Sequence, residues 1–286
     1  MPRGNIPRQP SKVGRHDKAK TARVAAKPLQ ITPAKSEKPK PTKITLPRPT
    51  AAKAAGSTMK GYNPIAPERI SEILKRLDKR YPNVKCALHH NSAWELLVAT
   101  ILSAQCTDVR VNMVTPILFK KYPTPTHFAA LQPEDLEPDI RSTGFFRNKS
   151  KSVVGAARKI ISDFGGEVPH TMAELLTVPG VARKTANVVL GSWFGIAEGV
   201  VVDTHVQRIS RRLELTKNED APKIEQDLMR VIPRDKWIAF SHQIIHHGRA
   251  ICIARKPKCA DCPLEDLCHA ADKTWSTVGI HKTAKP

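Results

Sequence analysis

Apolar residues recur at helical spacing through most of the chain after residue 66. Ile70, Ile73, Leu74 and Leu77 follow Pro67, which suits the first turn of a helix. Similar apolar faces predict further helices over residues 96–102, 111–118, 149–164, 204–214, 221–231 and 235–251. No stretch has the sustained alternation of a half-buried strand, and the dipeptides typical of β-hairpins are missing. The pattern therefore predicts an all-α fold.

Capping residues mark several of the predicted helix ends. Ser92 with Glu95, and Thr171 with Glu174, have the spacing of a capping box, in which side chains satisfy the free amides of the first turn. Residues 165–166 are both glycine and end the helical pattern before them. These signals divide the apolar pattern into separate helices.

A hairpin between two short helices is predicted at residues 176–190. Its turn consists of Pro179, Gly180 and Val181. Free backbone amides in such a turn attract an anion, and Arg183 and Lys184 stand beside it. The hairpin is thus a candidate for holding a DNA phosphate. From the residues alone, an ordinary αα-hairpin with a solvated basic turn stays open.

The charge of the chain points to a polyanionic partner. The 286 residues have a formal net charge of +21 and a pI near 10.0. Residues 1–60 carry 15 Lys and Arg against two acids, and they contain nine prolines and no Phe, Trp or Tyr. We expect a disordered basic arm there that adds non-specific affinity for nucleic acid. A solubilising tail or an organelle transit peptide are the alternatives.

The compartment is predicted from what the sequence lacks. There is no apolar run long enough to span a membrane and no secretory signal. We therefore expect a soluble intracellular protein without a membrane partner.

Four cysteines near the end of the chain form a candidate metal site. They are Cys252, Cys259, Cys262 and Cys268, with six, two and five residues between them. Disulfides are not expected inside cells. One loop with unequal gaps favours a [4Fe–4S] cluster, and structural zinc stays open because four thiolates suit it too. Cys86 and Cys106 are isolated and are expected to be small buried residues.

The first loop of this cysteine cage is strongly basic. Arg255, Lys256 and Lys258 lie between Cys252 and Cys259. A metal centre that fixes this loop would present the three cations to DNA phosphates. A solvated surface loop is the alternative for each side chain.

These motifs together resemble the endonuclease III family of iron–sulfur DNA glycosylases in the helix-hairpin-helix superfamily. The likeness spans roughly residues 65–275 and includes the stretches 102–108, 144–149, 202–206 and 247–249 besides the hairpin and the cysteines. It implies two helical domains with damaged double-stranded DNA in the groove between them. One is a six-helix barrel at 89–197. The other combines 61–88 with 198–286 and carries the cluster.

The resemblance also implies a reaction and its residues. The family removes oxidised pyrimidines and cleaves the strand on the 3′ side of the abasic site by β-elimination. Lys184 matches the nucleophile that forms a Schiff base, and Asp203 matches the catalytic carboxylate. The bland alternatives are a phosphate contact for Lys184 and a helix cap for Asp203. The positive end of the helix and Arg183 are expected to favour the neutral amine of Lys184.

Two further positions match loops that fill the gap left by an extruded nucleotide. Gln105 and Phe145 stand where the family places these wedges, although Phe145 or its neighbour Phe146 could instead pack in the core. Ala182 departs from the family, which can carry a second glycine there. We expect Ala182 to lie inside the second helix, where alanine is favourable.

Two other functions compete with this prediction. One is the adenine-removing glycosylase of the same superfamily, which lacks the lysine and has a further C-terminal domain. The other is a non-catalytic DNA-binding module. Because Lys184 is present, the resemblance favours a bifunctional glycosylase and lyase, and we expect it to be a monomer on the nucleoid of a bacterial cytoplasm.

Overall fold

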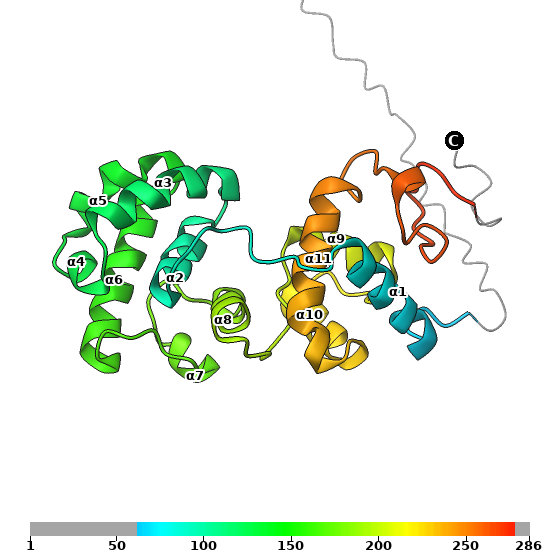
Figure 1. Ribbon diagram of the computed structural model, residues 1–286, viewed down its shortest axis with the longest axis horizontal. Helices are drawn as coiled ribbons and strands as arrows, with labels where there is room; N and C mark the ends of the chain where they lie inside the picture. The colour runs from blue at the N-terminus through cyan, green and yellow to red at the C-terminus, as the bar shows by residue number, and fades with distance from the viewer. Residues whose placement is uncertain (1–61, 278–286) are drawn as a thin grey trace, which may run out of the picture. The chain divides into compact units, whose positions relative to one another are not determined.

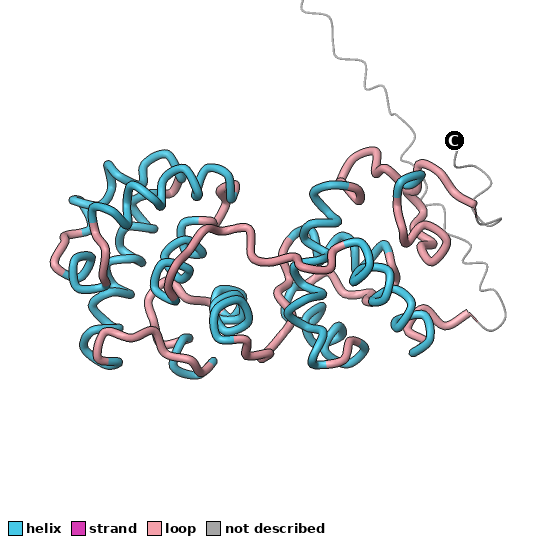
Figure 2. The backbone as a smooth tube through the Cα atoms, viewed as in Figure 1, coloured by secondary structure: helices cyan, strands magenta, loops and turns pink. Residues whose placement is uncertain are grey.

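The computed structural model describes residues 62–277, and the predicted arm at 1–60 lies outside this range (Figure 1). Helices joined by loops make up the described residues, in which no strand occurs (Figure 2). The α-helices are α1 (Pro67–Arg80), α2 (Ala93–Leu102), α3 (Asp108–Lys121), α4 (Pro125–Ala129), α5 (Pro133–Ile140), α6 (Phe146–Phe164), α7 (Met172–Leu175), α8 (Arg183–Val189), α9 (Thr204–Arg212), α10 (Ala221–Val231) and α11 (Trp237–Ala250). Short helical turns are η1 (Arg141–Thr143), η2 (Leu190–Phe194), η3 (Arg234–Lys236) and η4 (Cys259–Asp261). The all-α prediction is confirmed for this part of the chain.

A first hydrophobic core surrounds α2. Trp94 and every residue from Leu96 to Leu102 are buried, so this helix is apolar on all sides. Helices α3 to α8 supply the rest of this core, with α6 packed against both α4 and α5. The buried residues run from Leu88 to Leu190 in one continuous segment.

A second core joins the beginning of the described chain to its end. Ile70, Ile73, Leu74 and Leu77 form the buried face of α1, as their spacing predicts, and they pack with residues from 200 to 264. Helices α9, α10 and α11 supply most of the partners. Both cores lie in one compact unit, and the domain boundaries given by the sequence stay a prediction. Among the described residues no helix is long and apolar enough to cross a membrane.

Two short helices and one helix start escape the sequence pattern. Helices α4 and α5 begin with Pro125 and Pro133 in the first turn, and each buries only one or two apolar side chains. A short helix with so few buried residues leaves little periodicity to detect. Helix α6 begins at Phe146, three residues before the predicted start, because Phe145 in a left-handed conformation is its N-cap.

The predicted caps occur in the structure. Ser92 Oγ accepts a hydrogen bond from Glu95 N at 3.1 Å, and Thr171 Oγ1 accepts one from Glu174 N at 3.3 Å. Glu95 Oε2 accepts from the amide of Asn91 at 2.6 Å, one residue before the position that a capping box requires.

Candidate functional site

The predicted hairpin is formed by α7, a tight turn and α8. Gly180 has φ of +78°, and a Cβ at this position would lie 2.5 Å from Ser152 Cβ of α6. Only glycine fits both the backbone and the contact. Val181 donates its amide to Val178 O at 3.1 Å and buries its side chain. The turn is therefore pressed against α6.

Ala182 is the N-cap of α8 rather than part of the helix. Its φ of −96° and ψ of 169° are those of extended backbone. The expectation that Ala182 lies inside the helix is thus wrong by one residue, because the chain is still extended as it leaves the Gly180 turn. No positive φ is needed here, so alanine is unstrained.

Lys184 and Asp203 line the same cavity. Lys184 is exposed on the first turn of α8, and Asp203 precedes α9. The cavity has about 610 Å³ of open space and is also lined by residues of α2, α3 and α11. The fold therefore brings an amine and a carboxylate from different helices to one opening.

Asp203 is held in place by its capping role. Its Oδ1 accepts hydrogen bonds from His205 N at 2.8 Å and Val206 N at 2.9 Å. The cap expected from the sequence is present, and the same carboxylate lines the cavity. Two amide donors fix the orientation of the group.

Arg183, the neighbour of Lys184, forms an ion pair with α10. Its Nε lies 3.0 Å from both carboxylate oxygens of Glu225 on α10, and its Nη2 donates to Glu198 O at 3.3 Å. Asn187 Nδ2 donates to the same Glu225 at 2.8 Å. A DNA contact by Arg183 would compete with this ion pair, which also offsets the positive charge expected to act on Lys184.

Several residues of the cavity wall are not singled out by the sequence as site residues. Arg249 Nη2 on α11 pairs with Asp108 Oδ2 of α3 at 2.6 Å. Burial lowers the pKa of His242 to about 4, aided by the nearby His246, and His242 Nε2 lies 3.2 Å from Ser192 Oγ. Asp108 and Arg249 fall in stretches that carry the family resemblance, whereas nothing in the sequence pattern distinguishes His242.

The two predicted wedge residues share an unusual backbone. Gln105 has φ of +54° and Phe145 has φ of +48°, and both side chains are exposed, with that of Phe145 at 62%. A left-handed conformation is costly for residues of this kind and is found where function or packing requires it. Phe146 packs against the first core, so the two phenylalanines divide between core and surface.

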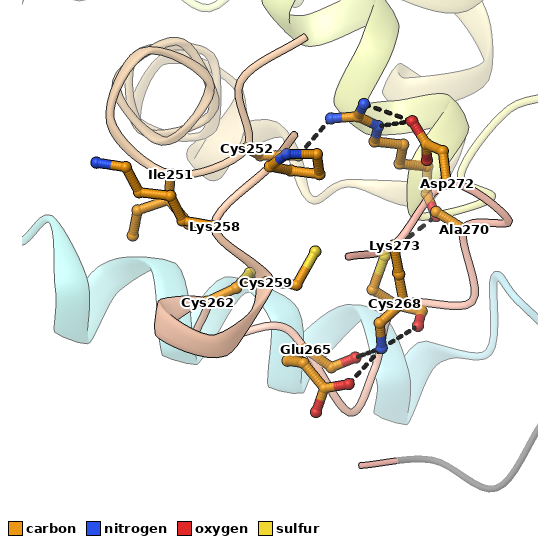
Figure 3. A pocket seen from close by; sticks show the side chains of 12 residues that line it. Ile251, Cys252, Lys258, Cys259, Cys262, Glu265, Cys268, Ala270, Asp272 and Lys273 are labelled. Carbon is orange, nitrogen blue, oxygen red and sulfur yellow. Dashed lines mark hydrogen bonds and ion pairs between the residues drawn. The ribbon is translucent and has the colours of Figure 1, made fainter. Parts of the chain in front are cut away.

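The four cysteines of the candidate metal site line one cavity (Figure 3). All four are free thiols of intermediate exposure. Within residues 62–277, no three His, Cys, Asp or Glu are grouped as around a single metal ion. Burial raises the pKa of Cys262 to about 12, so thiolates here require a compensating positive charge. Four thiols around one cavity fit the corners of a cubane cluster.

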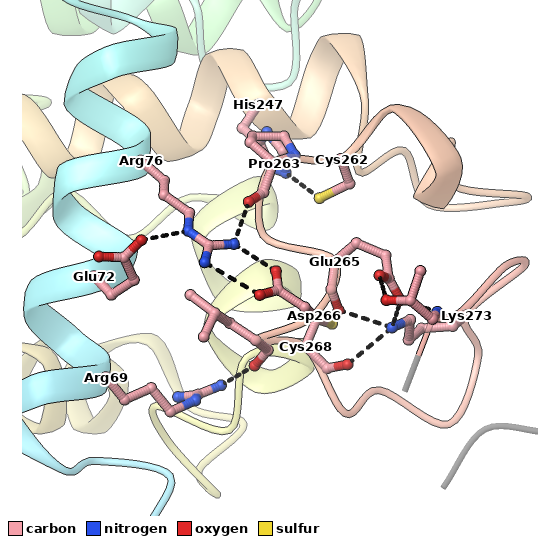
Figure 4. A network of polar contacts seen from close by, with 12 residues as sticks. Arg69, Glu72, Arg76, His247, Cys262, Pro263, Glu265, Asp266, Cys268 and Lys273 are labelled. Carbon is pink, nitrogen blue, oxygen red and sulfur yellow. Dashed lines mark hydrogen bonds and ion pairs between the residues drawn. The ribbon is translucent and has the colours of Figure 1, made fainter. Parts of the chain in front are cut away.

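Polar contacts from α1 hold the cysteine segment (Figure 4). Arg76 Nη1 donates to Pro263 O at 3.0 Å, and its guanidinium also pairs with Asp266. Arg69 Nη2 donates to Leu267 O at 2.5 Å. Backbone carbonyls between the third and fourth cysteines are thus fixed by a helix from the other end of the described chain.

The basic loop is exposed where the sequence places it. Arg255, Lys256 and Lys258 are all exposed, and Pro257 between them is buried. Lys258 N donates to Ile251 O at 3.0 Å, which closes the loop beside the cysteine cavity. Lys256 has a left-handed φ of +53°.

Two family models match the chain. One, described as the HhH-GPD superfamily of base excision DNA repair proteins, matches residues 98–234. The other, the iron–sulfur binding domain of endonuclease III, matches residues 252–268, which begin and end at predicted cysteine ligands. The prediction of a [4Fe–4S] cofactor in preference to zinc is thereby confirmed.

The chain matches known proteins over nearly their whole length. Endonuclease III of Synechocystis is 57% identical over 204 residues, which are 71% of this chain and 93% of that protein. Endonuclease III of Bacillus subtilis is 44% identical, over 72% of this chain and 94% of that protein.

Solved structures agree with the sequence relatives. The structure of a trapped endonuclease III–DNA covalent intermediate aligns with a TM-score of 0.68 and 42% identity, covering 71% of this chain and 96% of that one. A thermostable thymine-DNA glycosylase aligns at 0.64 with 22% identity over 71% of this chain and 96% of that one, which shows a shared fold.

Proposed function

The chain belongs to the endonuclease III family of DNA glycosylases with abasic-site lyase activity, and on this premise we propose that it excises oxidised pyrimidines through a Schiff base on Lys184. The observation that carries the proposal is the shared cavity of Lys184 and Asp203. The trapped covalent intermediate of the relative with 42% identity supports it.

Lys184 supplies the nucleophile. Its neutral amine attacks the sugar C1′, and the bond to the damaged base breaks with its electron pair leaving on the base. Loss of a proton from nitrogen and opening of the sugar ring give an imine to C1′. The imine acidifies the 2′ proton, and its removal expels the 3′ phosphate by β-elimination. Lys184 is exposed on the cavity, so an extruded sugar can reach it.

Asp203 stabilises the charge that develops on the sugar. The C1′ centre becomes positive as the base departs, and a carboxylate that two amides hold in place beside the cavity can stabilise that charge without first reorganising. The same group accepts a proton from the Lys184 ammonium when the two approach. Asp203 thus combines a cap with a role in the reaction.

Gln105 and Phe145 fill the space left by the extruded nucleotide. Both are exposed at the tips of strained loops, where rigid side chains can enter the duplex. Phe145 supplies the apolar wedge, and Gln105 supplies an amide for the unpaired base. Phe145 is the only exposed aromatic residue of α6 and its N-cap, so we expect no other aromatic side chain there to contact the bases.

Two segments hold the DNA backbone. In the turn Pro179–Val181, Gly180 offers its amide to a phosphate, because Pro179 has no N–H and Val181 donates its own to Val178 O. Arg255, Lys256 and Lys258 offer charge. Cys252, Cys259, Cys262 and Cys268 would hold the [4Fe–4S] cluster, which would give this basic loop a rigid support. We place the protein, as a monomer, on the nucleoid of a bacterial cytoplasm, since its relatives come from bacteria.

Borohydride trapping on duplexes with an oxidised pyrimidine or an abasic site tests the proposal. Wild-type protein should form a covalent adduct with both duplexes. It should release the oxidised base but should not release a mispaired adenine from a third duplex. Lys184→Gln should form none, while Lys217→Gln, which changes an exposed lysine away from the cavity, should trap normally. An adduct with Lys184→Gln would refute the assignment of the nucleophile.

A further inference from the structure

Lys149 is a buried lysine whose ammonium donates to two uncharged backbone carbonyls. It lies in the first turn of α6 with 4% of its surface exposed. Its Nζ donates to Leu102 O at 2.8 Å and to Thr143 O at 2.7 Å. Lysine is almost never buried without a counter-charge, because removing the ammonium from water is costly. Burial accordingly lowers the pKa of Lys149.

The two carbonyls stand at the bases of the two wedge loops. Leu102 is the last residue of α2, three positions before Gln105. Thr143 ends η1, two positions before Phe145. The amide of Lys149 makes the ordinary helical bond to Phe145 O at 3.1 Å, which places the lysine one helical turn from the tip of the second loop. One residue therefore joins both loops from beneath.

The two loops need such a link because their tips are strained. Gln105 and Phe145 both hold left-handed backbone conformations with exposed side chains, so packing at the tips does not enforce them. The two loops lie far apart in the sequence, so no short stretch of chain connects them. A rigid bond between their bases fixes the separation of the tips.

We propose that Lys149 is a positioning residue for nucleotide extrusion, which sets the spacing of Gln105 and Phe145 so that both enter the duplex together. The inference rests on the proposed function of the site, since the two side chains are wedges only if a nucleotide is extruded. Lys149 does not line the cavity of Lys184 and Asp203, so its effect on the reaction passes through the loops.

The test compares two abasic-site duplexes. In one, the abasic nucleotide faces an opposing base, which has no pairing partner and needs support once the abasic nucleotide is extruded. In the other, it lies in a one-nucleotide bulge with no opposing base to support. Lys149→Met keeps the length of the side chain and removes its donors. Single-turnover cleavage should fall roughly 10- to 100-fold on the first duplex and far less on the bulge, because misplacement of about 1 Å can cost 10²-fold.

Lys159→Met is the matched control. It removes the same charge from the same helix, where Lys159 pairs with Asp163 on the surface. Lys159→Met should cleave both duplexes as the wild type does. Equal losses on both duplexes for Lys149→Met, as a merely destabilised enzyme would show, would overturn the proposal. If the wild type traps neither duplex, the proposed function itself fails.

Two more variants test the proposal, and the first of them does so even if Lys149→Met does not fold. Lys149→Arg keeps a cationic donor of different shape. The ratio of its cleavage rate on the bulge to its rate on the first duplex, which has an opposing base, should exceed the wild-type ratio. An unchanged ratio contradicts the proposal. Where Lys149→Met does fold, adding it to Phe145→Ala should lower the cleavage rate on the first duplex little further, because the wedge is already lost. Full additivity would mean that Lys149 acts elsewhere.

Discussion

Arg183 and Glu225 join the helix of the proposed nucleophile to α10: Arg183 Nε lies 3.0 Å from each carboxylate oxygen, and Glu225 is 7% exposed. Asn187, one turn further along α8, donates to the same carboxylate. Lys184 lies between these two anchors in the sequence. The carboxylate therefore fixes the rotation of α8 and with it the direction from which Lys184 meets the cavity.

Glu225→Gln should weaken this anchor. We expect the free energy of unfolding to fall by about 1–3 kcal/mol. The buried side chain of Glu225 would lose its charge, whereas Arg183 is half-exposed and could be hydrated instead. Urea denaturation measures the change. Glu198→Gln removes the exposed carboxylate that pairs with Arg234 and should cost at most about 0.5 kcal/mol. Equal effects of the two variants would contradict the anchoring role.

Gly180→Ala should be far more harmful than alanine at another left-handed glycine. Gly165 has φ of +63° and open space where a Cβ would lie, so Gly165→Ala costs strain alone, about 1 kcal/mol. Gly180→Ala adds a clash with Ser152 and should cost several times as much. Thermal unfolding of both variants checks the difference. A similar loss for both would show that the turn can move away from α6.

Acid should destabilise the fold through His242. Its folded pKa of about 4 lies below the ordinary value of 6.5, so the unfolded chain binds the proton more tightly between these values. Stability is therefore retained above pH 6.5 and lost as the pH falls toward 4, by up to about 3 kcal/mol. Burial lowers the pKa of His247 to about 4 as well, so His242→Gln should make this slope shallower without abolishing it, whereas His127→Gln on the surface of α4 should leave the slope unchanged. An unchanged slope for His242→Gln would exclude this origin.

Deletion of residues 1–60 should separate binding from chemistry. The segment carries 15 Lys and Arg and lies outside the described residues. We expect weaker DNA binding and a smaller dependence of the binding constant on salt, since each phosphate contact contributes about 0.9 to the slope. The single-turnover rate at saturating protein should stay unchanged. A salt slope equal to that of the full chain would mean that this segment does not contact DNA.

Features that depend on near neighbours in the chain can be predicted from the amino-acid sequence. Apolar spacing predicted most helices, such as the buried face of α1, and the Ser92 cap followed from its distance to Glu95. The spacing of four cysteines favoured a cluster that the family match then confirmed. These features are local because a helix face or a cap is set by residues only three or four positions apart.

Contacts between residues far apart in the chain could not be predicted and depend on the folded structure. It turned Arg183 toward Glu225, brought Asp203 to the cavity of Lys184, and put the ammonium of Lys149 beneath two loops. Helical spacing puts Lys149 on the same face of α6 as the buried Val153 and Ile160, but it does not show which groups the ammonium meets. Its burial follows from how α2, η1 and α6 pack, and packing is a property of the whole core.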